Sequence, residues 1–395
     1  MPEAYFNGGS INGFTANAAP IFLPNAVGGY MPAKAATYDK KGFGSNADKP
    51  NAIVTALSKG YVVASVGARG RTLEKDGKYT GKAPAAIIDL KSAVRYLHFN
   101  DQRMAGDANK IISNGTSAGG ALSALLGASG DHRDYNADTA YEWEFNGLNQ
   151  FSRIDMSRLS AAGYNDRSQS KPRIEGELTA DQIKTSHELK AAFPAYINSL
   201  NLKDEKGNLL TLDKEGNGSF KEYVKQVIVR AADTARKNGT DFSDKPWLTL
   251  SKEGVVDMDW NGYIHSEKRM KSPPAFDAFD LSSGENNLFG TETVNNQHFT
   301  SYALERSTAK GGMADAHIIK MMNAMNYVEN PKAAEHWRIR VGTSDRDTSH
   351  AISAILAIKL NMAGKQVDYE TPWGIPHAGD YDLDALFKWA DSIAK

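Results

Sequence analysis

Cysteine is absent from this 395-residue chain, and its absence excludes several kinds of chemistry. Without cysteine there is no disulfide bond, no thiolate metal ligand and no cysteine nucleophile. The chain also lacks a continuous apolar run of about 18 residues, so we expect no membrane-spanning helix. The segment MPEAYFNGGSING has neither the basic nor the apolar part of a secretory signal, which predicts a cytoplasmic location. A chain shortened at its N-terminus would show the same pattern.

An excess of charge of either sign is also lacking. Lys and Arg together number 46 and Asp and Glu 47, which gives a net charge of −1. This balance gives no support for nucleic acid or an anionic membrane as a partner. The sequence contains neither G-x-x-x-x-G-K-[ST] nor a strand followed by G-x-G-x-x-G, so we expect no nucleotide cofactor.

Patterns typical of metal sites are few as well. His132 and Asp134 are too few to bind a metal ion by themselves. The segment DKEGNGSF, residues 213–220, begins like a calcium-binding EF-hand loop. Its twelfth position is Val224, which cannot supply the carboxylate that such a loop needs. We therefore expect no metal cofactor.

Strands and helices alternate in the first third of the chain. Residues 61–66, YVVASV, form a continuous apolar run of strand length, as expected for a strand covered on both faces. Residues 83–99 place apolar side chains on one helix face. Residues 110–115, KIISNG, predict the next strand, and GGALSALL the helix that follows it. This alternation is typical of an α/β protein with a parallel sheet.

The pattern changes in the middle of the chain and then returns. Polar, lysine-rich segments separate isolated helices there, for example over 219–239, and 204–208 predict the turn of a small hairpin. After residue 335, a strand, a helix, the strand QVDYET and a closing helix follow. We therefore predict an α/β-hydrolase core in two parts, 1–140 and 333–395. Residues 141–332 would form a largely helical cap, or lid, inserted between them.

The stretch NGTSAGG contains the spacing Gly115-x-Ser117-x-Gly119 between a predicted strand and a predicted helix. A serine on a very sharp turn needs neighbours without bulky side chains, so that its hydroxyl is exposed as a nucleophile. A flexible Gly-Ser loop is the alternative interpretation of this stretch. The residues that follow predicted strands further along the chain favour the nucleophile.

Serine, acid and histidine follow three predicted strands in the chain order that α/β-hydrolases use. Ser117 follows KIIS, Asp345 and Asp347 follow RIRV, and His377 follows VDYET. Loops after parallel strands meet at one edge of a sheet, so these side chains are expected to meet there. Serine would attack an acyl carbon, histidine would transfer its proton, and an aspartate would orient the imidazole. Asp345 is also a candidate helix cap.

An oxyanion intermediate requires two backbone donors. The N–H of Ala118, directly after the nucleophile, is one candidate. The second is expected from a glycine-rich loop near the N-terminus, where NGGS offers Gly9 or Ser10.

Several long blocks of the chain together resemble one family, the bacterial tannases, which are tannin acyl hydrolases related to feruloyl esterases. The blocks include NGGSINGFTANAAPIFLPNAVGGYMP, GYVVASVGARGRT, NGTSAGGALSALLGASG, YEWEFNG, RMKSPPAFDAFDLSSGENNLFG, RDTSHAI and IPHAGDYDL. The resemblance implies an α/β-hydrolase fold and hydrolysis of galloyl esters to gallate. A small galloyl ester is then the expected partner.

The resemblance also implies roles for individual residues. Ser117, His377 and Asp345 match the family's nucleophile, base and triad acid. Asp347, Lys271 and Glu285 match residues that hold galloyl hydroxyls. Without the resemblance, Lys271 and Glu285 are interpreted as surface charges on a polar cap. The alternative functions are a feruloyl-type or general carboxylesterase, and a catalytically impaired polyphenol-binding protein.

Two intervals differ from what this fold is expected to contain. The predicted oxyanion loop, NGGS, begins at the seventh residue of the chain. The interval 131–142 is nearly all polar and cannot supply the buried strand expected after the helix that follows Ser117.

Overall fold

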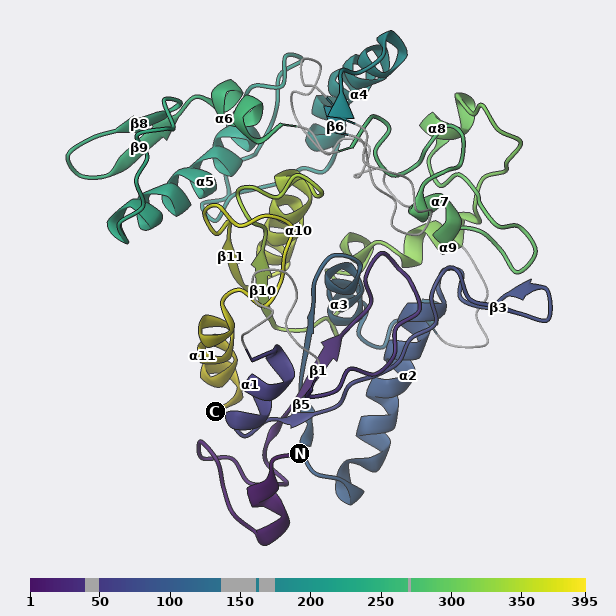
Figure 1. Cartoon of the computed structure of the whole chain (residues 1–395), viewed down its shortest axis with the longest axis vertical. Coiled ribbons are helices and arrows are strands. Elements are labelled where there is room, and N and C mark those ends of the chain that lie inside the picture. Colours follow the sequence, from purple (N-terminus) through teal and green to yellow (C-terminus); the bar gives the residue numbers. More distant parts are fainter. Residues whose placement is uncertain (40–49, 136–160, 163–174, 269–270) are drawn as a thin grey trace.

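The computed structural model describes residues 1–39, 50–135, 161–162, 175–268 and 271–395 (Figure 1). The YEWEFNG block, 141–147, lies outside the described residues. No helix in the described part of the chain is both long and apolar enough to cross a membrane.

A three-stranded parallel sheet forms the centre of the N-terminal part. Its strands are β1 (Pro20–Asn25), β2 (Val62–Val63) and β5 (Asp107–Gly115), in the order β2-β1-β5. The central strand β1 is buried along its whole length, with Ile21 paired to Val62 on one side and Ile111 on the other. The sequence predicted β2 and β5 but not β1, although AAPIFLP is an apolar run of strand length.

Helices α1 (Ala52–Ser58), α2 (Ala85–Asn100) and α3 (Ala118–Ser129) pack against this sheet (Figure 1). α2 and α3 confirm the helices predicted over 83–99 and after Ser117. α2 buries Ile87, Leu90 and Leu97, which are among its expected apolar face. A short hairpin, β3 (Glu74–Lys75) and β4 (Lys78–Tyr79), extends from the connection between β2 and α2.

The C-terminal part contains β10 (His336–Arg340), α10 (His350–Met362), β11 (Gln366–Glu370) and α11 (Leu383–Ala394). This order agrees with the sequence. β10 and β11 pair in parallel, but as a separate two-stranded sheet. The expectation that all three loops leave one sheet is therefore wrong for the described residues, where no strand joins β5 to β10. The interval 131–142, most of which lies outside the described residues, supplies none in its described part.

Where it is described, the region between these parts contains far more helix than strand, with long connecting loops. The longer helices are α4 (Ala180–Ser199), α5 (Ser219–Lys237) and α6 (Trp260–Glu267), and α5 confirms the helix predicted over 219–239. The predicted turn at 204–208 is present, with an antiparallel bridge between Lys203 and Leu209. The remaining elements are β6 (Ala161–Ala162), β7 (Glu175–Gly176), β8 (Leu248–Leu250), β9 (Val255–Met258), α7 (Gly284–Leu288), α8 (Ser301–Glu305) and α9 (Ala316–Met321).

Two hydrophobic clusters connect this middle region to both other parts. One cluster joins β1, α2, α3 and α11 with buried side chains of residues 276–328. The other joins α5 and α6 with α10. The segments that precede and follow residue 271 are therefore anchored on different parts of the molecule, and the candidate site lies where these segments meet.

Candidate active site

Ser117 occupies the turn between β5 and α3. Its φ of 58° and ψ of −127° place it in a conformation that residues with a side chain rarely adopt. Holding such a residue costs about 1–3 kcal/mol and is typical of functional sites. Ser117 is exposed, whereas the next residue, Ala118, is buried at the first position of α3. The geometry is that of a nucleophile elbow rather than a flexible Gly-Ser loop.

The two glycines of the motif allow this turn to pass very close to its neighbours. A Cβ on Gly115 would overlap the carbonyl oxygen of Gly119. A Cβ on Gly119 would lie 2.7 Å from the carbonyl oxygen of Asn25, at the end of β1. The side chain of Asn25 donates to the carbonyl of Gly119 at 3.0 Å. The elbow is therefore held against the carboxyl end of β1.

Asp345 and His377 are in direct contact. His377 Nδ1 lies 2.9 Å from Asp345 Oδ2. The other carboxylate oxygen of Asp345 accepts the N–H groups of Asp347 at 2.8 Å and Thr348 at 3.0 Å. Both oxygens are thus engaged, which fixes the orientation of the carboxylate toward the imidazole.

Backbone contacts hold the loops of these two residues together. The N–H of Thr343 donates to the carbonyl of Pro372 at 3.0 Å, and that of Ser344 to Ile375 at 3.1 Å. The hydroxyl of Thr343 accepts the N–H of Gly374 at 2.7 Å. Asp345 and His377 are therefore positioned by the loops that directly follow β10 and β11.

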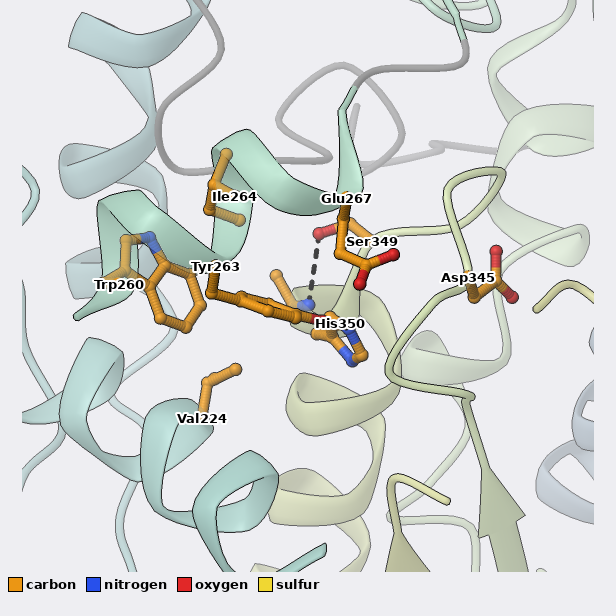
Figure 2. A pocket seen from close by; sticks show the side chains of 9 residues that line it. Val224, Trp260, Tyr263, Ile264, Glu267, Asp345, Ser349 and His350 are labelled. Carbon is orange, nitrogen blue, oxygen red and sulfur yellow. Dashed lines mark hydrogen bonds between the residues drawn. The ribbon is translucent and has the colours of Figure 1, made fainter. Parts of the chain in front are cut away.

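A pocket lined by residues of α6 and α10 lies next to the loop that carries Asp345 (Figure 2). Tyr263 of α6 donates its hydroxyl to the carbonyl of Thr343, and His350 Nε2 lies 2.9 Å from that hydroxyl. Figure 2 shows Tyr263 and His350 side by side, with Asp345 at the edge of the pocket. Tyr263, from the middle region, thus stabilises the loop that carries Asp345.

The loop of His377 lies against the elbow. Gly379 packs so closely on Thr116 that a Cβ there would overlap the Thr116 hydroxyl, one residue before Ser117. His377 Nε2 lies 3.4 Å from Asp347 Oδ2, and no hydrogen bond joins it to Ser117 in the described structure. The backbone thus brings the predicted triad loops together, while Nε2 of His377 faces the carboxylate of Asp347.

The charges around His377 raise the pKa of its imidazole. Burial alone would lower the pKa of His377, but the hydrogen bond to Asp345 and the charges of Asp345 and Asp347 outweigh burial and raise it. For Asp345, burial acts to raise the pKa, yet contact with His377 and with backbone N–H groups lowers it. Asp345 therefore remains an anion beside a more basic imidazole.

Asp347 and Lys271 lie beside this histidine, and the charges of both act on Glu285. The Nζ of Lys271 lies 2.9 Å from Asp347 Oδ1 and 3.9 Å from the centroid of the Phe276 ring. Burial raises the pKa of Glu285, and the charge of Lys271 opposes this shift. Lys271 is 8% exposed, so its interpretation as a surface charge on a polar cap does not hold.

Gly9 and Ser10 are not near the elbow, so the prediction that they supply an oxyanion donor is wrong. They precede β1 in a segment that contacts the chain just before β2 and β5, where Tyr5 donates to the carbonyl of Gly60 and Gly106 donates to that of Ala16. The N–H of Gly9 already donates to the carbonyl of Ala4 at 2.9 Å. β1 runs parallel to β5, so of the two segments that flank β1 it is the one after the strand that lies at the elbow.

That loop, residues 26–30, offers candidate oxyanion donors that were not expected from the sequence. A Cβ on Gly119 would also lie 2.9 Å from the carbonyl oxygen of Val27. Within the described residues, no group accepts the N–H of Gly28 or of Gly29. The missed signal was the apolar run before the loop, which marks a strand and makes Gly28-Gly29 the glycine-rich segment at its carboxyl end.

Solved structures of several proteins are similar to this chain over its whole length. A tannase from Fusobacterium nucleatum is 48% identical with a TM-score of 0.91, and the match covers 100% of this chain and 90% of that one. The native tannin acyl hydrolase from Lactobacillus plantarum is 40% identical with a TM-score of 0.92, covering 100% and 89%. A tannin acyl hydrolase in complex with ethyl gallate has the same identity, TM-score and coverage.

One family model matches part of the chain. The BD-FAE model, from a feruloyl-esterase-type α/β-hydrolase family, matches residues 36–199. No curated protein matches the chain. Together with the solved structures, the family model indicates an α/β-hydrolase-type fold.

Proposed function

Because this chain belongs to the bacterial tannase family of carboxylic ester hydrolases, we propose that it hydrolyses galloyl esters, releasing gallate and an alcohol. The observation that carries the proposal is that Asp347 contacts both His377 and Lys271, while the charges of Lys271 and Asp347 act on the carboxylate of Glu285. A site for a hydroxylated ring and a site for acyl transfer are thus adjacent. Structures of related tannin acyl hydrolases contain ethyl gallate and 3,4-dihydroxybenzoate.

The proposed mechanism follows from the positions of the side chains. Ser117 attacks the ester carbonyl, and His377 takes the hydroxyl proton and then gives it to the leaving alcohol. Asp345 holds the imidazole through Nδ1 and stabilises its positive charge. Water activated by His377 then hydrolyses the galloyl-enzyme. The N–H of Ala118 and an N–H of Gly28 or Gly29 are the proposed oxyanion donors.

The acyl group is selected by its ring hydroxyls. Carboxylates of Glu285 and Asp347 accept hydrogen bonds from phenolic hydroxyls, and the ammonium of Lys271 donates one. These side chains are partly or wholly buried, so an ester without ring hydroxyls would remove water from them without replacing its hydrogen bonds. Sites of this kind discriminate by about 10⁴-fold or more in favourable cases.

The middle region is proposed to act as the cap of the enzyme, with 1–140 and 333–395 as its hydrolase core. Lys271 and Glu285 come from the middle region, whereas Asp347 and the triad residues come from the core. The galloyl ring would therefore bind between the two.

Replacement of Ser117 by alanine tests the assignment of the nucleophile. We expect Ser117→Ala to lower kcat for methyl gallate by about 10⁵-fold or more, because no alternative nucleophile remains. The unfolding temperature should change little, since the side chain of Ser117 is exposed and its replacement by alanine removes few contacts. Turnover at the wild-type rate in a folded variant would contradict the proposal.

The family-model match favours one alternative substrate class, the hydroxycinnamate esters. Comparing kcat/KM for methyl gallate and methyl ferulate separates the two functions. We expect methyl gallate to be strongly preferred. The ferulate ring lacks one of the three hydroxyls of gallate and carries a second one as a methyl ether. Equal values would contradict the assignment of Lys271, Glu285 and Asp347. Gallate binding without any hydrolysis would instead identify a polyphenol-binding protein.

A further inference from the structure

Arg71 is a buried cation, 5% exposed, that belongs neither to the proposed triad nor to the proposed ring site. Its Nε donates to the carbonyl of Gly29 at 2.9 Å, and its own N–H donates to the carbonyl of Tyr30 at 2.8 Å. Both acceptors lie in the loop after β1. One face of Arg71 is thus bound to the segment that offers the oxyanion donors.

The other side of Arg71 is bound to α7. Nη1 donates to the side chain of Asn287 at 3.1 Å. The guanidinium also lies against the backbone of Gly284, where a Cβ would be only 3.0 Å from Nη2. Glu285 is the next residue. A single side chain therefore bridges the oxyanion loop and the short helix that carries a galloyl-binding carboxylate.

The charge of Arg71 also acts on that carboxylate. The charged or titratable groups that face Glu285 are Lys271, Arg71, Asp347 and the phenol of Tyr30. Burial raises the pKa of Glu285, and the positive charges of Lys271 and Arg71 lower it again.

We propose that Arg71 is a positioning residue for the galloyl group, holding Glu285 and the loop 28–30 at a fixed separation. The ring hydroxyls and the ester carbonyl can then be bound at the same time, with the carbonyl next to Ser117. This inference rests on the proposed function. It adds that the ring site and the oxyanion site are joined through one arginine and not only through the substrate.

The shape of arginine is essential to this role. Its planar fork donates in two directions at once, whereas a lysine ammonium supplies the charge but cannot reproduce both contacts. Arg71→Lys therefore removes the bridge and keeps the charge, and Arg71→Met removes both. The two variants separate positioning from electrostatics.

The experiment is steady-state kinetics of both variants with methyl gallate between pH 5.5 and 7.5. For Arg71→Met we expect KM to rise about tenfold or more at neutral pH and to fall as the pH is raised. The reason is that Glu285, without this cation, ionises at a higher pH than in the wild type. For Arg71→Lys we expect a smaller rise in KM with a pH dependence close to that of the wild type. Arg69→Met is the matched control, because Arg69 is on the same loop, is exposed and pairs with Asp89.

Glu285→Gln, alone and combined with Arg71→Met, decides whether Arg71 acts through Glu285. We expect Glu285→Gln to raise KM and Arg71→Met to add little to it, because coupled residues are not additive. If Glu285→Gln raises KM but Arg71→Met leaves KM and its pH dependence unchanged, this inference is overturned and the proposed function stands. A lower kcat with unchanged KM in Arg71→Met also overturns it. If neither substitution changes KM, the galloyl-site assignment itself fails.

Discussion

The imidazole of His377 lies between two carboxylates that have different tasks. Asp345 contacts Nδ1 at 2.9 Å, and Asp347 approaches Nε2 at 3.4 Å while also contacting Lys271. In the free enzyme, Asp347 would therefore act on the proposed base as well as in the proposed ring site. A galloyl hydroxyl bound to Asp347 would compete for the carboxylate that faces His377.

This arrangement predicts a displaced pH profile. The neutral imidazole is the active form, so raising the pKa of His377 above its ordinary value of 6.5 moves the acid limb of kcat/KM above pH 6.5. In Asp347→Asn, one of the two negative charges that raise the pKa of His377 is lost, so the acid limb of kcat/KM should move to lower pH. Profiles of kcat/KM for methyl gallate measure both midpoints. A wild-type midpoint below 6.5, or the same midpoint in both enzymes, would contradict this account.

At the scale of elements, the segment that carries Glu285 is organised around one buried carboxylate, Asp277. Asp277 and His298 are fully buried, and Asp277 Oδ1 lies 2.7 Å from His298 Nδ1. The same oxygen accepts the side-chain amide of Asn286 at 2.7 Å. Its other oxygen accepts the N–H groups of Phe299 and Thr300 and the hydroxyl of Thr300. One carboxylate thus fixes α7 relative to the chain that follows it.

We expect Asp277→Ala to destabilise the protein by about 3–5 kcal/mol, because it leaves several buried donors and a histidine without their acceptor. Chemical denaturation monitored by tryptophan fluorescence measures the change. Asp244→Ala is the control: its carboxylate is 70% exposed and pairs only with a surface lysine, so the expected change is within about 0.5 kcal/mol. Similar values for the two variants would disprove the organising role of Asp277.

At the scale of the whole molecule, the two ends of the chain pack against each other. Phe387 of α11 contacts the rings of Phe22 in β1 and Tyr61 before β2, with centroids 5.2 and 5.3 Å apart. The hydroxyl of Tyr61 donates to Asp391 at 2.7 Å, and the side chain of Asn12 donates to the same carboxylate at 2.8 Å. The closing helix therefore joins the part that carries His377 to the sheet that carries Ser117.

Phe387→Ala is expected to lower the free energy of unfolding by about 3–5 kcal/mol, because it opens a cavity between β1 and α11. Thermal and urea unfolding measure the loss. Phe99→Ala removes the same side chain from an 80% exposed position and should change stability by no more than about 0.5 kcal/mol. A loss for Phe387→Ala as small as that for Phe99→Ala would show that the chain ends are not coupled.

The sequence by itself determined the elements whose signals are local. α2, α5 and α10 repeat apolar residues with helical spacing, and such periodicity needs only neighbours within the same helix. The elbow at Ser117 was predictable because glycine and serine spacing reflects a backbone turn of a few residues. The order of Ser117, Asp345 and His377 also needed no tertiary information.

Only the tertiary structure decided which distant segments meet. The position of the loop after β1, next to the elbow, follows only from the pairing of β1 with β5, because strand pairing depends on residues far apart in sequence. The contact between Lys271 and Asp347, and the bridge from Arg71 to Gly29 and Asn287, join segments from separate parts of the chain. A charged residue that will be buried has the same local sequence pattern as one that remains in solvent. Only packing of the complete chain determines which of the two it becomes.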